Sequence, residues 1–325
     1  MEPRTLDSMN NFLVLGGSGF VGSALCERLV RRSGGGGRIS VPSRRSARVK
    51  HLLTLPTVEV VQADLHDDVQ LARLVAGRDA VVNLVAILHG SEAEFERAHV
   101  ALPRRLAQAC LAAGVRRVVH VSALAADAQA PSMYLRSKAA GEAALRQSGL
   151  ELTILRPSVI FGAGDAFLNL FARLQAVLPV MPLACASARF QPVWLDDVAE
   201  AIVRALADST TAGETLECAG PRVYTLAELV RLAGRWSGHE RPVLALPPAL
   251  GHLQATIMEW LPGETLMSRD NLRSMQVANI ASGRAPGLAR LGIDATTLEA
   301  IGPGMLAASG ELARLYRWRA AAHSG

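Results

Sequence analysis

Three residues have types and a spacing that suit proton transfer: Ser122, Tyr134 and Lys138. Tyr134 and Lys138 are four positions apart, so on a helix they lie on the same face. An ammonium group beside a phenol favours the phenolate and lowers the pKa of the tyrosine, which could then act as a general acid or base near neutral pH. Ser122, at the expected end of a strand, could hold the substrate oxygen. A tyrosine and a lysine on an ordinary helix surface are the alternative.

A glycine-rich turn near the start of the chain predicts a site for nucleotide phosphates. Residues 12–15 are apolar, glycines occupy positions 16, 17, 19 and 22, and an apolar-periodic helix is expected to follow. This order of strand, turn and helix is the context that a dinucleotide fingerprint needs. The glycines allow a tight turn, close approach of a pyrophosphate and close packing of helix on strand, and the helix start offers N–H groups to the phosphates. A plain turn is the alternative.

The residues after the second expected strand, 39–41, indicate which nicotinamide cofactor fits. NAD-binding proteins usually carry a carboxylate here, on the ribose diol. This chain has Ser43, Arg44 and Arg45 instead. A guanidinium group can hold a 2′-phosphate with two parallel hydrogen bonds. We therefore predict NADP(H) rather than NAD(H), with Arg44 as the main phosphate ligand and Ser43 and Arg45 assisting. Two surface arginines in a loop are the alternative.

The elements that must position these residues alternate along the first half of the chain. Helices are expected between apolar strands, including 69–75, a long one over 92–113, and 134–148. The expected strands are 12–15, 39–41, 58–61, 79–85, 118–122 and 152–155. Apolar strands that alternate with helices are typical of a parallel sheet covered on both faces. The predicted fold class is α/β, a Rossmann-type doubly wound parallel sheet with a smaller, mostly C-terminal α+β domain.

Beyond Pro157 the alternation is less regular. Helices are expected over 166–177 and 198–206, the second capped by Asp196 and Asp197. Thr225 and Glu228 form a capping box for a helix that begins at Leu226. We predict an NADP-binding domain over 1–165, to which 190–210 returns, and a smaller substrate or partner domain made of 166–189 and 211–325.

Composition excludes several classes of protein. Half of the 325 residues are apolar, the net charge is +5, and no tract of Lys and Arg is long enough for a nucleic-acid surface. The four cysteines are far apart and the eight histidines lack metal spacing, so we predict no metal site. The first residues lack the apolar stretch of a signal peptide, and no apolar run is long enough to span a membrane. We expect a cytoplasmic protein, either free or peripheral on the inner face of the membrane.

Two segments of the expected smaller domain, 168–183 and 244–261, are rich in Leu, Ala, Val and Met. A domain core would explain this composition. The alternative is a cleft for a lipid-like or isoprenoid substrate, or a surface that rests on a bilayer. In that case His252, Met258, Trp260 and Met267 would line or flank it. The predicted partners are a small apolar molecule and a membrane or respiratory complex.

In these motifs the chain resembles the short-chain dehydrogenase/reductase superfamily, in its extended or atypical, epimerase/dehydratase-like branch. Residues 12–25, 118–142 and 152–165 carry the resemblance, and 156–162 is similar to the branch's loop that closes on the nicotinamide. More narrowly, 122–126, 134–142 and 266–271 resemble bacterial relatives of an NADPH-binding accessory subunit of mitochondrial complex I. Some members of that group are linked to quinone biosynthesis.

The resemblance implies a full set of site residues. Asp64 and Leu65 are similar to the pair that flanks the adenine, although Asp64 could equally be a turn residue. The implied catalytic residues are Ser122, Tyr134 and Lys138. The implied cofactor ligands are Gly16, Gly19, Phe20, Val21, Gly22, Ser43, Arg44, Arg45, Asp64, Leu65, Ala86, Tyr134, Lys138 and Pro157.

One departure concerns His99, which stands where extended members often have an asparagine that orders a water beside the lysine. Imidazole has a different reach and a titratable charge, which puts a complete proton relay in doubt. The sequence as a whole indicates two alternative functions. The first is an NADP(H)-dependent oxidoreductase or epimerase for a quinone-like or isoprenoid-like carbonyl or alcohol. The second is a non-catalytic NADPH-binding accessory factor of a respiratory complex or a quinone-biosynthesis assembly.

Overall fold

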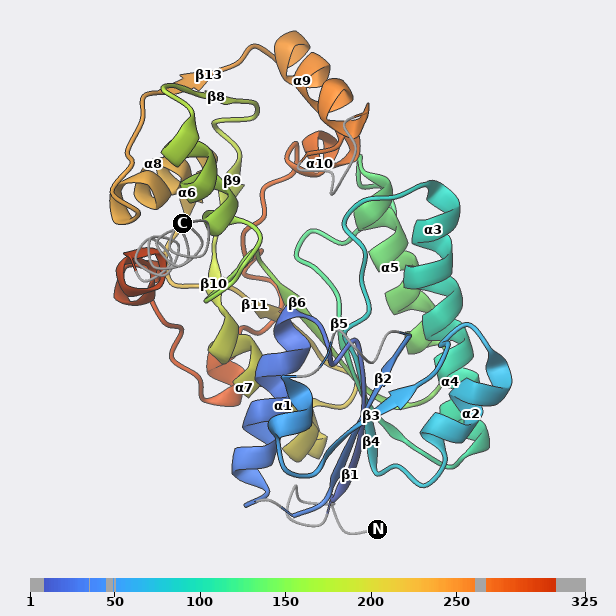
Figure 1. The fold of residues 1–325 in the computed structure, drawn as a ribbon. Coiled ribbons are helices and arrows are strands. Elements are labelled where there is room, and N and C mark those ends of the chain that lie inside the picture. The colour runs from blue at the N-terminus through green and yellow to red at the C-terminus, as the bar shows by residue number, and fades with distance from the viewer. Residues whose placement is uncertain (1–8, 35, 45–48, 50, 261–266, 308–325) are drawn as a thin grey trace, which may run out of the picture.

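A seven-stranded parallel sheet forms the centre of the computed structural model, which describes residues 9–34, 36–44, 49, 51–260 and 267–307 (Figure 1). Its order is β11-β6-β5-β4-β1-β2-β3, and every neighbouring pair is parallel. The strands are β1 (Asn11–Leu15), β2 (Arg38–Ser43), β3 (Val58–Gln62), β4 (Ala80–Asn83), β5 (Arg117–Val121), β6 (Glu151–Pro157) and β11 (Thr215–Cys218). The order reverses between β1 and β4, where doubly wound sheets bind ligands at the carboxyl ends of their strands. The predicted fold class is confirmed.

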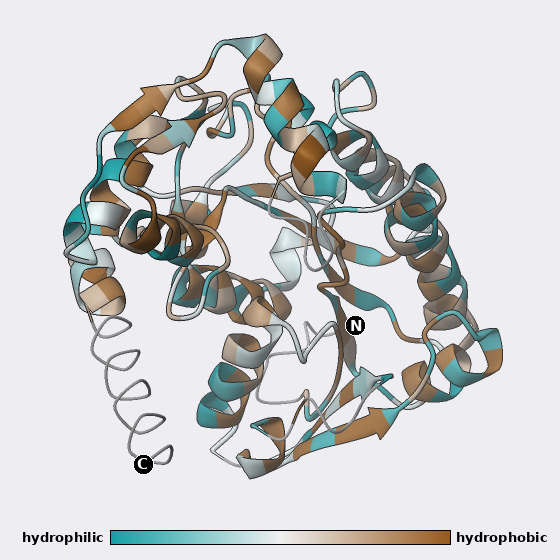
Figure 2. Cartoon of the chain, turned by 45° about the horizontal axis from the view of Figure 1, so that its top comes forward, coloured by the Kyte–Doolittle hydropathy of each residue, from teal (hydrophilic) through white to brown (hydrophobic). Residues whose placement is uncertain are grey.

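Helices cover both faces of this sheet because its strand residues alternate between two cores. Phe12 and Val14 of β1 pack with α1 (Phe20–Arg32) and α7 (Leu195–Ala207). Leu13 and Leu15 face the opposite core. That core includes residues of α2 (Asp68–Val75), α4 (Leu102–Ala112) and α5 (Met133–Arg146). Figure 2 shows the central strands as largely hydrophobic, as burial on both faces requires.

The long helix expected over 92–113 is confirmed with one irregularity: α3 (Glu92–Glu96) continues through a π-helical turn, Arg97–Ala101, into α4. The cap predicted for α7 was wrong. The helix begins at Leu195 after an N-cap residue without a side-chain hydrogen bond, and Asp196 and Asp197 lie within its first turn. The Asp197 carboxylate instead accepts hydrogen bonds from the backbone N and the hydroxyl of Thr296.

A second group of elements has its own core, which includes Phe171, Met181 and Leu229. Its longer helices are α6 (Leu168–Val177), α8 (Leu226–Trp236) and α9 (Pro248–Trp260), followed by the short α10 (Arg269–Ser274). Short strands complete it: β7 (Ile160–Phe161) with β10 (Val193–Trp194), β8 (Met181–Leu183) with β13 (Val243–Ala245), and β9 (Arg189–Phe190) with β12 (Tyr224–Thr225). The predicted capping box of α8 is confirmed, since Thr225 and Glu228 bond reciprocally.

The C-terminal part of the chain also returns to the sheet. Strand β11 pairs with β6 at the sheet edge, and Leu288, Leu291 and Ile293 join the core beneath α1 and α7. The predicted division into domains stays a prediction.

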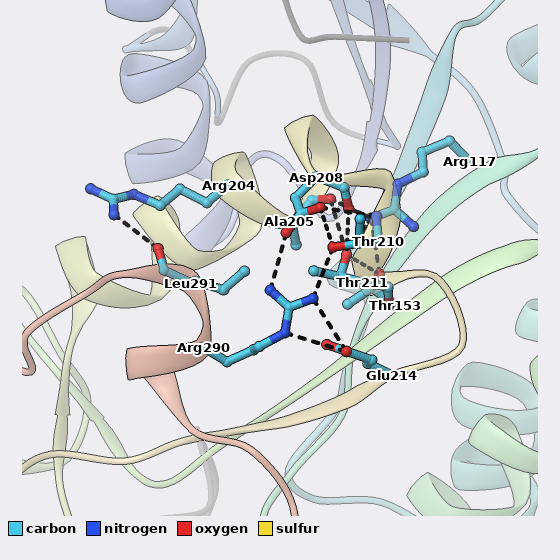
Figure 3. Close-up of polar contacts among 10 residues, drawn as sticks. All are labelled: Arg117, Thr153, Arg204, Ala205, Asp208, Thr210, Thr211, Glu214, Arg290 and Leu291. Carbon is cyan, nitrogen blue, oxygen red and sulfur yellow. Dashed lines mark hydrogen bonds and ion pairs between the residues drawn. The ribbon is translucent and has the colours of Figure 1, made fainter. Parts of the chain in front are cut away.

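Two arginine side chains, the buried Arg117 and the partly exposed Arg290, hold this returning segment in place at the amino ends of the strands (Figure 3). Arg117, the first residue of β5, donates to the hydroxyls of Thr153 and Thr211 and to the carbonyl of Ala205. Arg290 forms ion pairs with Asp208 and Glu214 at 3.2 and 3.3 Å. The sheet, the end of α7 and residues 288–291 are therefore joined far from the carboxyl ends of the strands.

Candidate functional site

The proposed catalytic residues gather where β5 ends and α5 begins. Ser122 directly follows β5 and is only 4% exposed. Its hydroxyl has no hydrogen-bond partner among the described residues. Lys138, 2% exposed, reaches across from α5 and donates from Nζ to the carbonyl of Val121 at 2.8 Å. A buried hydroxyl without a partner is uncommon, so this end of β5 presents an unfilled hydrogen-bonding position.

Tyr134 lies in the first turn of α5, with its ring held among aromatic neighbours. Its centroid is 5.7 Å from the His99 ring and 6.3 Å from the Phe95 ring, both in edge-on arrangements. The Ser132 hydroxyl caps the helix by accepting from the backbone N of Leu135. The helix cap fixes the backbone position of Tyr134, and the aromatic neighbours fix the orientation of its ring.

The electrostatics of this pair differ from the prediction. Burial raises the pKa of Tyr134 to about 12, whereas a lowered value was expected. Burial also lowers the pKa of Lys138 to about 8, against the opposing effect of the Glu142 carboxylate. The expectation was wrong because loss of hydration outweighs attraction: a charged phenolate is disfavoured where water is excluded, and the ammonium group donates to the Val121 carbonyl.

His99 holds the loop after β4 against α5. Its Nε2 accepts from the backbone N of Ile87 at 3.0 Å, and its Nδ1 lies 2.8 Å from the hydroxyl of Ser137. Because a backbone N–H can only donate, Nε2 must be unprotonated, which places the proton on Nδ1. Burial, aided by the charge of Lys138, lowers the pKa of His99 to about 3. The ring is therefore neutral at physiological pH, and it links the loop after β4 to helix α5.

The glycine-rich turn has the geometry of a phosphate cradle. Gly16 has a φ of +80°, which disfavours any side chain. A Cβ at Gly22 would overlap the backbone of Gly16 and Gly17, so only glycine allows α1 to pack this closely on the turn. Helix α1 begins at Phe20 after Gly19, with no side-chain cap and no acid in its first turn. The N–H groups of its first turn therefore face outward for an anion.

The residues expected to meet the adenosine half lie at the ends of β2 and β3. Ser43 ends β2 and Arg44 follows it as an exposed residue, whereas Arg45 is outside the described residues. Asp64 makes a turn, since its Oδ1 accepts from the backbone N of His66 at 3.0 Å. Burial lowers the pKa of His66, and the nearby charges of Arg97, Arg105 and Arg44 lower it further.

Other expected ligands come from neighbouring strands. Leu65 follows β3, Ala86 is exposed in the loop after β4, and Pro157 ends β6. The carbonyl of Pro157 accepts from the backbone N of Leu124, which joins the ends of β5 and β6. The structure thus brings the β4, β5 and β6 ends and the start of α5 together.

The residues expected to flank an apolar cleft are placed differently. His252 and Trp260 are exposed on α9, and Trp260 is 84% exposed. Met258 is half-buried. Met267 packs beside a small cluster of Ala184, Ala255 and Leu272. The two exposed side chains do not line an interior cleft.

Two residues that sequence reasoning missed reach this region from the C-terminal part of the chain. Asp270 bonds to the start of α5, and the Asn279 side chain accepts from the hydroxyl of Ser158 and the backbone N of Val159. Both contacts join segments at least 120 positions apart. Among the described residues, no group of His, Cys, Asp or Glu could hold a metal ion. No helix in the described ranges is long and apolar enough to cross a membrane.

Comparison with known proteins agrees with this geometry. The model of the NAD dependent epimerase/dehydratase family matches residues 12–219. The chain is 32% identical over 316 residues to the mitochondrial NADH dehydrogenase (ubiquinone) 1 alpha subcomplex subunit 9 of Mus musculus, covering 94% of this chain and 81% of that protein. It is 30% identical over 257 residues to a ceramide reductase of Caulobacter vibrioides, covering 78% of this chain and 79% of that one.

A solved structure shows the same fold. The NADPH-dependent quinone oxidoreductase of Escherichia coli, crystallised with NADPH, superimposes with a TM-score of 0.71 at 20% identity, over 92% of this chain and 98% of that one. With the glycine turn, the sheet order and the family match in agreement, the chain belongs to the NAD dependent epimerase/dehydratase family.

Proposed function

We propose that this protein binds NADP(H) and acts as an oxidoreductase or epimerase on an apolar carbonyl or alcohol. The observation that carries the proposal is the buried hydroxyl of Ser122, which has no hydrogen-bond partner in the part of the chain that the structure describes. It lies at the end of β5, where Lys138 donates to the carbonyl of Val121. The glycine turn fits a dinucleotide, because Gly16 and Gly22 leave no space for side chains and α1 begins without an acid. When bound, the nicotinamide supplies or accepts a hydride.

The residues of the site then have separate roles. With its pKa near 12, Tyr134 is protonated at neutral pH, so it suits a general acid that donates its proton to a carbonyl oxygen. The Ser122 hydroxyl donates a hydrogen bond to that same oxygen. Lys138 binds the ribose.

Turnover with several substrate classes tests the proposal. The protein is mixed with NADPH and, in turn, a long-chain ketone, a ceramide precursor ketone and an isoprenoid quinone, and loss of NADPH absorbance is followed. Reduction of one of these supports the proposal. Mass spectrometry of protein purified without added nucleotide identifies any cofactor or apolar molecule that it retains. Retained NAD(H) in place of NADP(H) would contradict the proposed cofactor.

We expect Arg44→Ala to weaken NADPH binding about 10- to 100-fold while leaving NADH binding nearly unchanged. Hydrogen bonds to a charged group contribute about 1.5–3 kcal/mol, and only NADPH carries the 2′-phosphate that Arg44 would hold. The positive surroundings of His66, which include Arg44, Arg97 and Arg105, support the assignment. Isothermal titration measures both affinities. Arg31→Ala, on the exposed end of α1, is the control. Equal NADPH affinity in the two variants would show the assignment to be wrong.

A peripheral membrane position is supported by α9, which packs its small residues inward and its large ones outward. Gly251 and Ala255 are buried, and a Cβ at Gly251 would lie 2.9 Å from the Cβ of Ala184. The large apolar side chains on its outer side are more than half exposed. They are Leu250, Leu253, Ile257 and Trp260. Their spacing of three and four residues makes one continuous stripe, and hydrophobic stretches are visible on this helix in Figure 2.

A stripe of this kind suits the interface of a bilayer, where a terminal tryptophan acts as an anchor. We expect part of the protein to sediment with vesicles that contain anionic lipid, and a Leu253→Ser/Ile257→Ser double variant to lose most of that binding. Each buried aliphatic side chain contributes about 1.5–3 kcal/mol. Leu111→Ser, exposed on α4, is the control. Failure of the wild-type protein to sediment at low salt would exclude the membrane position.

The second candidate is a non-catalytic, NADPH-binding accessory factor of a respiratory assembly. It is favoured by the similarity over 94% of the chain to a mitochondrial NADH dehydrogenase subunit. A scaffold would need the nucleotide for stability but would not need the Tyr134 hydroxyl. Replacement of that hydroxyl therefore separates the two candidates.

A further inference from the structure

We propose that Asp270 is a positioning residue for Tyr134, and that the segment formed by α9 and α10 thereby completes the active site. The inference rests on the proposed role of Tyr134 as a proton donor. Asp270 is 7% exposed and belongs to α10, whereas Tyr134 is 136 positions away on α5.

The Asp270 carboxylate caps the start of α5 with both of its oxygens. Oδ1 accepts from the backbone N of Met133 at 2.8 Å, and Oδ2 accepts from the backbone N of Tyr134 at 3.0 Å. These are the first two N–H groups of the helix, and the next one, of Leu135, bonds to Ser132. Helix α5 has no acid in its own first turn. The negative charge that complements the helix dipole is therefore supplied by α10.

Helix α10 is itself held by an internal cap and by contacts from two other parts of the chain. Its own capping box joins Ser268 and Asn271. Glu259, near the end of α9, accepts from the backbone N and from Nε of Arg269 at 2.7 and 2.8 Å. The side chain of Asn271 donates to the carbonyl of Leu88, in the loop after β4. Asp270 is therefore restrained by the contacts of its own helix, and through it α9 and the loop after β4 are connected to α5.

This arrangement controls Tyr134 through its backbone. A hydrogen bond to the backbone N of Tyr134 fixes the point from which the side chain extends, and the rings of Phe95 and His99 fix its direction. Without the carboxylate, two buried or half-buried N–H groups lose their acceptor and the first turn of α5 can open. Proton transfer requires the phenol within hydrogen-bond reach of the substrate oxygen, and a misplacement of about 1 Å can cost about 100-fold in rate.

The test compares Asp270→Ala and Asp270→Asn with the wild-type protein. We expect Asp270→Ala to lower kcat by about 10- to 100-fold, with KM and the NADPH dissociation constant changed less than about threefold. Asp270→Asn keeps one carbonyl acceptor, so its loss should be smaller. The control is Thr225→Ala, which removes the cap of α8 and should lower stability without lowering kcat. Equal kcat in all of these folded variants would overturn the proposal.

A second readout needs no substrate. The chain has three tyrosines, so carbon-13-labelled tyrosine gives few NMR signals, and the signal lost in Tyr134→Phe identifies Tyr134. We expect Asp270→Ala to shift or broaden that signal and to speed amide exchange at Met133 and Tyr134, and Thr225→Ala to do neither. An unchanged Tyr134 signal would overturn the proposal whatever the enzyme's activity. A changed signal in a protein without turnover would leave the positioning role intact and contradict the proposed function instead.

Discussion

Tyr134→Phe is expected to lower the turnover of an apolar carbonyl substrate by about 100- to 10,000-fold, the usual contribution of a positioned general acid. The substitution removes only the hydroxyl, so the ring keeps its contacts with Phe95 and His99 and the helix keeps its cap. The affinity for NADPH should change by less than about threefold, because the cradle at Gly16 and Gly22 is untouched. Initial rates of NADPH consumption and a binding titration measure the two effects.

Tyr224→Phe is the matched control. Tyr224 is buried and donates its hydroxyl to Glu299 at 2.8 Å, so this variant also loses one phenol hydroxyl from a packed site. It should keep its turnover. If Tyr134→Phe supports the protein's function in cells as well as the wild type does, the accessory-factor alternative is favoured and the catalytic role of Tyr134 is rejected.

The parts of the fold that could be predicted from sequence are those set by neighbouring residues. Val14 and Leu15 before the glycine turn predict a strand that enters α1, and Thr225 with Glu228 predicts a helix start; both are present. Strand alternation and glycine positions act over a few residues, so one sequence is enough to detect them. The same holds for the placement of Ser122 at a strand end and Tyr134 at a helix start.

Contacts between distant segments could not be predicted in this way. The bonds from Asp270 to α5 and from Asn279 to Ser158 depend on how the C-terminal part packs over the sheet. Nothing in the residues around Asp270 marks it as the acid that caps another helix. The contacts of His99 are similar, because its ring lies in a π-helical turn and bonds to Ile87 and Ser137, which are distant in sequence.

The direction of a pKa shift is also outside what spacing can predict. The spacing of four positions from Tyr134 to Lys138 correctly indicates a shared helix face, and charge alone would then lower the pKa of the phenol. Burial decides the outcome instead, raising the pKa of Tyr134 and lowering that of Lys138. A bound nucleotide would add charges and hydroxyls at this place, so the neutral phenol describes the protein before it binds.

Arg117→Ala is expected to lower the free energy of unfolding by about 3–5 kcal/mol, because several buried oxygens lose their donor at about 1–3 kcal/mol each. Arg117 is 3% exposed, and it donates to Thr153, Thr211 and the carbonyl of Ala205 (Figure 3). It also donates to the carbonyl of Glu151. Burial lowers the pKa of Arg117, and the nearby carboxylates of Glu151 and Asp208 oppose this shift. In the variant the oxygens that accept from Arg117 stay buried and lose their donor, and a cavity replaces the side chain.

Urea unfolding followed by circular dichroism measures this effect, with Arg116→Ala as the control one position earlier. Arg116 is exposed and makes a single 3.3 Å bond to the carbonyl of Gly149, so its loss should change stability by less than about 0.5 kcal/mol. Arg117→Met restores most of the volume but none of the donors. It should therefore stay within about 1–2 kcal/mol of Arg117→Ala if unsatisfied oxygens dominate the loss. Wild-type stability in Arg117→Met would show that the donors and the charge of Arg117 contribute nothing to stability beyond the volume of the side chain.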